Sequence, residues 1–380
     1  MFDFLPSPLD YAAPFLIVLT ALVYVHEMGH YLVARWNGVR VEVFSIGFGP
    51  EIYGWNNKAG TRWKISAIPL GGYVKMFGEG DMVTGIDDVE DREMTEEEKK
   101  VSFHHKRLKQ RVAIVFAGPL ANFIFAAVLF AGIFTFVGSP VILSGIGTVQ
   151  AGSAAEAAGI KQGDRIVAID DKDIATFEDI RAYISESPGK NLTIHVERDG
   201  RAVSLRATPK SRTIDAADGP KEIGLLGVTP DPNQVSYDRH NPLTATWMGV
   251  ERTVSISGQI LYALGEIISG KRTAEELGGP LRIAKFSGDV AQGGVLSLIF
   301  FMAALSINLG LINLFPIPVL DGGHLVFYAI EGIRGRPLGV RAQEYGLRIG
   351  FALVMTLIVF ATWNDLVQLK VFEFLKNLVT

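Results

Sequence analysis

Four long apolar stretches constrain this 380-residue chain more than any other feature. They cover Tyr11–Ala34, Val112–Val137, Val295–Leu320 and Ile349–Trp363, and the second and third contain no Asp, Glu, Lys or Arg. About 20 helical residues cross a hydrocarbon core of roughly 30 Å, so the first three predict transmembrane helices. The fourth is shorter, and Arg348 at one end must extend toward the interface. We therefore expect a polytopic α-helical membrane protein with four transmembrane helices.

Composition agrees with this expectation and excludes other classes. Hydrophobic residues make up 48% of the chain and charged residues 20%, with a formal net charge of −4. Since there is no basic excess, we expect no nucleic-acid partner. The chain has no cysteine, which excludes disulfides, cysteine–zinc sites, iron–sulfur clusters and a thiol nucleophile.

Basic residues predict how the spans are oriented. Arg35 and Arg40 flank the first span, and the basic stretch Phe103–Arg111, which suits anionic lipid head groups, precedes the second. Because cytoplasmic loops are enriched in Lys and Arg, we expect these residues in the cytoplasm. Both termini and the Gly138–Gly294 region then lie on the opposite side. Four arginines between the third and fourth spans agree: Arg334, Arg336, Arg341 and Arg348.

The loop between the first two spans is predicted to contain a β-hairpin at Thr61–Val74. We expect its strand to end at Pro69 and to be followed by a turn at Gly71-Gly72. The acidic Glu79–Lys100 stretch that follows is typical of a mobile loop. The strand is predicted from an alternation of apolar and polar positions: Trp63, Ile65 and Ala67 against Arg62, Lys64 and Ser66.

The insertion after the second span is predicted to be a compact domain rich in β-structure. A helix is expected at Thr176–Ser185, with Thr176 as its N-cap. Asp199-Gly200 is a strong signal for a two-residue turn that closes a hairpin. The expected strands are Gly145–Gln150, Arg165–Ile169, Asn191–Arg198 and Arg201–Thr208.

The Ala151–Ile180 run of this insertion resembles the PDZ family, in the variant found in envelope proteases. PDZ domains capture peptides by adding a strand to a sheet edge. The resemblance therefore implies an α+β PDZ domain inserted between the membrane helices. Whether it binds a ligand or serves as a folded spacer stays open.

The chain returns toward the membrane at Asn241–Ala291. Its Pro242–Ile268 segment is apolar but is interrupted by Glu251, Arg252 and Glu266. This pattern favours an amphipathic helix along the membrane surface, and a fifth span is the alternative.

An H-E-x-x-H motif lies within the first predicted span, at His26-Glu27-Met28-Gly29-His30. On a helix, positions i and i+4 differ by about 40°, so both imidazoles face one side and can bind one ion. Zinc prefers such nitrogen ligands, and Glu27 would stand beside the attacking water as its base. The alternative is a polar trio that stabilises helix packing. Ionisable groups at membrane depth are costly, which favours the functional interpretation.

A third ligand is predicted where the third apolar stretch ends. Pro316 and Pro318 interrupt the helix there and expose backbone groups. Asp321 is the first acidic residue after them, on the same side of the membrane as the H-E-x-x-H motif, and a carboxylate oxygen is an acceptable zinc ligand. His324 is the competing candidate.

Two motifs together resemble the site-2 protease family of intramembrane metalloproteases, namely HEMGH in the first span and NLFPIPVLDGG at the end of the third. The matching motifs run from about residue 20 to 330. Four further motifs match the bacterial RseP subgroup, the regulator-of-sigma-E proteases. They are GFGP at Gly47–Pro50, IPLGGYVKM at Ile68–Met76, AGPLANF at Ala117–Phe123 and GGPLRIA at Gly278–Ala284.

This resemblance implies a role for each matching residue. His26, His30 and Asp321 match the ligands of one Zn²⁺ per chain, and Glu27 matches the catalytic glutamate. Asn313 matches an asparagine that holds the substrate backbone near the metal. The Thr61–Val74 hairpin matches a membrane-reentrant element whose edge strand pairs with the substrate. That strand supplies six expected substrate-binding residues: Arg62, Trp63, Lys64, Ile65, Ser66 and Ala67.

The resemblance also implies a biological setting. The expected protein is a zinc metalloendopeptidase of a bacterial inner membrane, with its active site on the cytoplasmic side and a periplasmic PDZ domain. Its expected substrates are single-span membrane proteins, such as anti-sigma factor stumps or remnant signal peptides, already trimmed by a site-1-type protease. Well-known members carry two PDZ domains in tandem, whereas one is recognisable here, which puts any size filter built from both in doubt.

The expected domain organisation has four parts. Residues 1–137 form an N-terminal membrane core, 138–235 the PDZ domain, 236–294 the amphipathic membrane-surface segment and 295–380 the C-terminal membrane core. Two other function classes compete with the protease. An inert membrane scaffold carrying a PDZ domain would be free to lose Glu27. A transporter or metal channel would be expected to show inverted repeats or a chain of ionisable residues through its spans.

Overall fold

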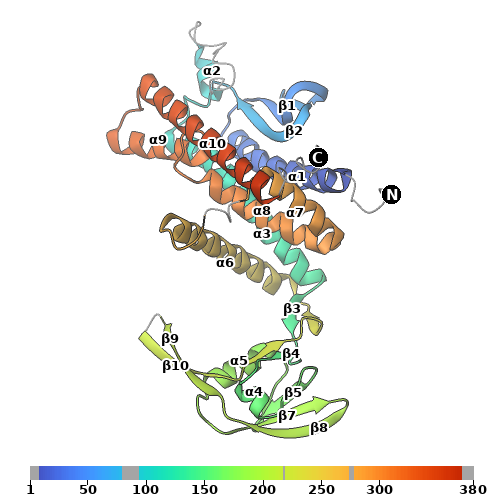
Figure 1. The fold of residues 1–380 in the computed structure, drawn as a ribbon. Coiled ribbons are helices and arrows are strands. Elements are labelled where there is room, and N and C mark those ends of the chain that lie inside the picture. Colours follow the sequence, from blue (N-terminus) through green and yellow to red (C-terminus); the bar gives the residue numbers. More distant parts are fainter. Residues whose placement is uncertain (1–7, 79–93, 217–218, 274–277, 370–380) are drawn as a thin grey trace, which may run out of the picture. The chain divides into compact units, whose positions relative to one another are not determined.

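The computed structural model describes residues 8–78, 94–216, 219–273 and 278–369. The chain divides into two compact units. One combines residues 1–132 with 242–380, and the other comprises residues 133–241. Figure 1 shows the helices of the first unit and the strands of the second.

Four helices in the described part of the chain are long and apolar enough to cross a membrane, as predicted. The protein is therefore an α-helical membrane protein with four candidate spans. These helices are α1 (Pro8–Trp36), α3 (Leu108–Phe136), α8 (Val295–Asn313) and α10 (Val340–Gln368).

Two of the predicted span boundaries are wrong. The third span was expected to reach Leu320, but α8 ends at Asn313. Pro316 and Pro318 lack the N–H groups that would continue the helix, and a residue that precedes a proline avoids helical geometry. The fourth helix is longer than its apolar core, because its first turns are polar and carry the exposed Arg348–Glu344 ion pair.

The hairpin after α1 is built from two long strands, β1 (Val41–Asn56) and β2 (Arg62–Met76). The predicted end of the strand at Pro69 and the turn at Gly71-Gly72 are wrong, since β2 continues through both. The strands fold over each other. Residues 43–46 pair with residues 72–75 and also with residues 62–65, which pair in turn with residues 53–56.

This pairing corrects the prediction that Arg62–Ala67 forms an edge strand. Residues 62–65 have strand partners on both sides, so their backbone groups are already hydrogen-bonded within the sheet. The two edges are the 51–56 segment of β1 and the 72–76 segment of β2. The reason is the length of β1: two of its segments, residues 43–46 and residues 53–56, pair with residues 62–65 from opposite sides.

The core of the helical unit joins the hairpin to three helices. Ala34 of α1, Met76 of β2, Ile114 of α3 and Tyr328 of α9 (Asp321–Arg334) lie in one buried cluster. The ion pair between Arg111 of α3 and Glu331 of α9 lies at the edge of this cluster. The cluster therefore fixes α1, α3 and α9 relative to one another, and the candidate site lies on these helices.

The α6 helix (Pro242–Ile268) meets α3 at Gly249, where a Cβ atom would overlap the backbone of Ala127, and its other buried residues are Ala245 and Thr253. It exposes Leu243, Trp247 and Tyr262. It is not among the four candidate spans, which counts against a fifth span. That it lies along the membrane surface stays a prediction.

Two short helices complete the helical unit. The α7 helix (Pro280–Gln292) begins where the buried Asp365 accepts hydrogen bonds from the N–H groups of Gly279, Leu281 and Arg282. The α2 helix covers Glu96–Val101, so the end of the predicted Glu79–Lys100 loop is helical. Residues 79–93 of that predicted loop lie outside the described residues.

The unit of residues 133–241 contains a four-stranded sheet in the order β6-β5-β7-β8. The predicted helix is present as α5 (Phe177–Ser185), with Thr176 and Asp179 forming a capping box. The predicted hairpin is also present and turns at Asp199-Gly200. The four strands are β6 (Lys172–Asp173), β5 (Arg165–Ile169), β7 (Leu192–Arg198) and β8 (Arg201–Ala207).

Smaller strand pairs complete this unit. Of these strands only β4 was predicted, since most of the others are short or polar and lack a hydrophobic alternation. The helix α4 (Ala154–Ala157) was missed for the same reason. The pairs are β3 (Ser139–Ile142) with β12 (Val235–Asp238), β4 (Ile146–Val149) with β11 (Val228–Pro230), and β9 (Lys210–Ala216) with β10 (Gly219–Leu225).

Candidate metal centre

The H-E-x-x-H motif lies on α1, as its spacing predicts. The His26 and His30 imidazoles are both buried, and their Nε2 atoms lie 3.2 Å apart. The rings meet edge to face, with an interplanar angle of 82°. This places two nitrogen lone pairs at one point on the helix surface.

Asp321 reaches the same point from the first turn of α9. Its Oδ2 atom lies 3.1 Å from His26 Nε2 and 3.5 Å from His30 Nε2. Oδ2 is buried and has no well-aligned hydrogen bond. His26, His30 and Asp321 are the one group of at least three potential metal ligands among the described residues, and His324, the competing candidate, is not part of it.

The three atoms fit a zinc ion. Ligand atoms about 2.0–2.1 Å from a tetrahedral zinc are about 3.3–3.4 Å from one another. The three observed separations, 3.1, 3.2 and 3.5 Å, bracket that value. A buried carboxylate oxygen without a hydrogen bond needs a cationic partner, which a divalent ion supplies. A tetrahedral ion held by these three atoms would keep a fourth position for water or substrate.

The outer ring nitrogens face α3. His30 Nδ1 lies 2.9 Å from the backbone carbonyl oxygen of Ile114, which can only accept, so Nδ1 donates its proton there. The Nε2 lone pair of His30 is then free for a metal, as is usual for a zinc-bound histidine. His26 Nδ1 lies 3.1 Å from the side chain of Asn122.

Glycines let these helices approach closely. A Cβ atom on Gly118 of α3 would overlap the His30 imidazole, and one on Gly29 of α1 would overlap the backbone of Ala117. A Cβ on Gly322 or Gly323 would overlap the backbone of residues 314–318. Sequence reasoning assigned these glycines no role at the site, although the AGPLANF and LDGG motifs contain three of them.

Glu27 lies on α1 outside the three-ligand group, next to the 72–76 edge of β2. Its Cγ atom would be 3.5 Å from a Cβ atom on Gly72. Its carboxylate lies near the backbone N–H of Val74. The predicted base therefore lies beside an outer strand of the hairpin sheet.

The other predicted substrate-binding residues are not brought to the metal centre by any described contact. Asn313 is the last residue of α8. Trp63 stacks on Phe44, with ring centroids 4.3 Å apart, and the Ser66 hydroxyl lies 3.2 Å from that of Ser45. Arg62 forms an ion pair with Glu51. The contacts of Arg62 and Ser66 thus lie within the hairpin, whereas Trp63 also packs edge to face against Tyr31 of α1, the neighbour of His30.

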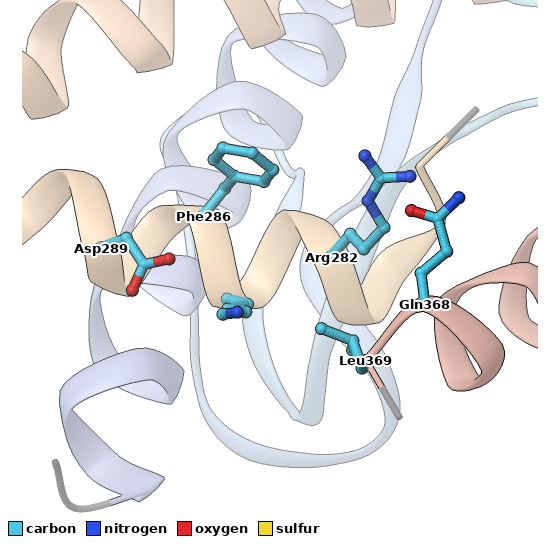
Figure 2. A pocket seen from close by; sticks show the side chains of 6 residues that line it. Arg282, Phe286, Asp289, Gln368 and Leu369 are labelled. Carbon is cyan, nitrogen blue, oxygen red and sulfur yellow. The ribbon is translucent and has the colours of Figure 1, made fainter. Parts of the chain in front are cut away.

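A pocket of about 190 Å³ lies between α7 and the end of α10 (Figure 2). None of the predicted site residues lines it, so it is not the metal centre. Its lining residues are Arg282, Lys285, Phe286, Asp289, Gln368 and Leu369.

Comparison with known proteins agrees with the fold and the site. Residues 14–357 match Peptidase family M50. A protein of Agrobacterium fabrum named as a zinc metalloprotease is 46% identical over 363 residues, which cover 94% of this chain and 96% of that protein. Metalloprotease MmpA of Caulobacter vibrioides is 37% identical over 388 residues, which cover 96% of this chain and 97% of that protein.

One solved structure, the PDZ domain of an SdrC-like protein from Listeria monocytogenes, is 20% identical and covers 28% of this chain and 97% of its own. Its TM-score of 0.18 is too low to establish a shared fold.

Four apolar helices and a candidate metal centre define a membrane protein with the side chains of a metallohydrolase. The chain belongs to Peptidase family M50, the site-2 protease family. It is accordingly a metalloprotease that uses zinc. The family resemblance, the enzyme class and the cofactor predicted from the sequence are confirmed.

Proposed function

We propose that this metalloprotease hydrolyses peptide bonds within the transmembrane segments of single-span membrane proteins. One observation carries the proposal. The two histidines of the candidate centre lie in the second half of α1, a candidate span, where they meet the buried Oδ2 atom of Asp321. A site intended for soluble peptides has no reason to place ionisable groups there.

The proposed zinc ligands are His26, His30 and Asp321. They would hold the ion, which would supply a Lewis acid for the scissile carbonyl and lower the pKa of the attacking water. Glu27 accepts the proton of that water and delivers it to the leaving nitrogen.

The substrate must unwind before it can be cut, because helical peptide bonds are hydrogen-bonded and shielded. An unpaired backbone group costs several kcal/mol in lipid, so the unwound segment needs partners. We assign that role to residues 72–74 of β2, in place of residues 62–67, because they lie beside Glu27 and pair with β1 on one side in the described sheet. Asn313 would hold one further backbone group of the substrate.

The remaining assignments follow from the family resemblance. We propose that residues 138–235 form a PDZ domain that restricts entry to trimmed substrates. Residues 1–137 and 295–380 would form the two halves of the membrane core, and residues 236–294 the surface segment. The protein would lie in a bacterial inner membrane, with the metal centre on the cytoplasmic side and the PDZ domain in the periplasm. Anti-sigma factor stumps or remnant signal peptides, released by a site-1-type protease, would be its substrates.

Cleavage of a tagged single-span substrate by the purified, detergent-solubilised chain tests this function. Wild-type protein should cleave with about one zinc per chain. Glu27→Gln should retain zinc and lose turnover, whereas Asp321→Ala should lose both. Cleavage that both substitutions leave unchanged would contradict the proposal.

A further inference from the structure

Asn122 is a fully buried polar residue of α3 that contacts His26 on the Nδ1 side of the ring, away from the proposed ligand atom Nε2. The Nδ2 atom of its carboxamide lies 3.1 Å from His26 Nδ1. The Oδ1 atom is also buried and makes no hydrogen bond in the described part of the chain. A carboxamide presents a donor on one side and an acceptor on the other, and a half-turn exchanges them.

The chemistry of a zinc-bound imidazole decides which atom must face the ring. If His26 gives its Nε2 lone pair to zinc, as the proposed function requires, its proton is on Nδ1. Nδ1–H is a donor, so only an acceptor can pair with it. If the Asn122 carboxamide rotates by half a turn, Oδ1 faces His26 Nδ1–H and accepts its hydrogen bond. Oδ1, which otherwise has no partner in the described part of the chain, then has one.

We propose that Asn122 is a positioning residue for zinc: its Oδ1 accepts a hydrogen bond from His26 Nδ1–H and so fixes the tautomer and the direction of Nε2. Such partners usually hold the outer nitrogen of a metal-bound histidine. For His30 the same role belongs to the Ile114 carbonyl, at 2.9 Å. Both partners lie on α3, which supplies no ligand itself but orients both imidazoles.

A hydrogen bond to its backbone also holds Asn122 in place. Ser306 of α8 donates a hydrogen bond to the Asn122 backbone carbonyl oxygen at 2.8 Å, and both residues are fully buried. This bond does not involve the carboxamide. Ser306→Ala therefore disturbs the same packing without touching His26, which makes it the matched control.

The experiment measures the zinc affinity of the purified full chain by competition with a chelator, beside the visible spectrum of the Co²⁺-substituted protein. Asn122→Leu keeps the size of the side chain and removes the acceptor. We expect zinc binding about 10- to 100-fold weaker and an altered Co²⁺ spectrum. Asn122→Asp restores an acceptor of the same shape, so its affinity should return to within a few fold of wild type. Ser306→Ala should leave both readouts unchanged.

Two results would overturn the inference. One is zinc affinity and a Co²⁺ spectrum in Asn122→Leu that equal those of wild type. The other is equal weakening in Asn122→Leu, Asn122→Asp and Ser306→Ala, which would indicate packing alone. His26→Ala separates the underlying function from this inference. If that variant binds zinc as wild type does, the ligand assignment itself is wrong.

Discussion

The close approach of α3 to His30 leads to a quantitative prediction for Gly118→Ala. A Cβ atom at this position would overlap His30 Nε2, the proposed ligand atom, and its neighbours Cε1 and Cδ2. To restore an ordinary contact of about 3.5 Å, the ring must withdraw by about 1 Å. It cannot do so and also keep its 2.9 Å hydrogen bond to the Ile114 carbonyl.

The magnitude follows from the tolerance of a zinc site. Ligand distances vary by about 0.2 Å, so a shift of about 1 Å removes His30 as a ligand unless the backbone moves. Overpacking of this kind costs about 1–3 kcal/mol, and about 1.4 kcal/mol is a factor of ten in affinity. We therefore expect zinc binding by Gly118→Ala to be about 5- to 100-fold weaker, with cleavage falling in parallel at limiting zinc.

The same helix provides the control. A Cβ on Gly132 of α3 would meet nothing within 4 Å. Gly132→Ala should be neutral or slightly stabilising, because alanine is the better helix former by about 1 kcal/mol. Chelator competition on both variants is the assay. Zinc affinity of Gly118→Ala within twofold of wild type would refute the reasoning.

Two further predictions concern residues away from the metal centre. Burial raises the pKa of Asp164, but hydrogen bonds from Arg198 and the Lys161 N–H outweigh it and hold that pKa below its usual value. Asp164→Asn should destabilise its unit by about 2–4 kcal/mol at pH 7, measured by hydrogen exchange of β7 amides. The difference between wild type and variant in the free energy of unfolding should be fully present above pH about 4. It should vanish as the pH falls through the pKa that Asp164 has in the folded protein, and a difference that stays constant with pH would contradict this. Asp365→Ala should free the first turn of α7 by removing the acceptor for three N–H groups, costing about 2 kcal/mol. Faster exchange of the Leu281 and Arg282 amides would report it, and unchanged exchange would count against it.

Local patterns in the sequence predicted the parts of the molecule that local physics determines. The apolar stretches predicted four spans because length and composition decide that property. The HEMGH spacing predicted that two imidazoles share a helix face, and Asp199-Gly200 predicted a hairpin because few other dipeptides make that turn. These features need no knowledge of distant residues.

Residues that act across the fold were harder to predict. Gly118 and Asn122 both lie in the AGPLANF motif, but the motif indicates no contact for either, and only the packing of α3 against α1 brings them to the histidines. The hairpin shows the same limit. Alternation correctly marked residues 62–67 as a strand, but alternation describes the faces of a strand and says nothing about its edges.

The strand edge matters because it decides where a substrate can pair. Residues 62–65 have their backbone groups engaged on both sides, so an incoming segment would find no free N–H or C=O there. Residues 72–74 pair with β1 on one side in the described sheet, and Gly72 lets α1 approach them closely, with Glu27 beside them. A side chain at residue 72 would push the edge away from Val23 and Glu27. Gly72 thus couples the position of the proposed base, Glu27, to the position of the strand that would hold the substrate. A larger residue at position 72 should impair cleavage without weakening zinc binding.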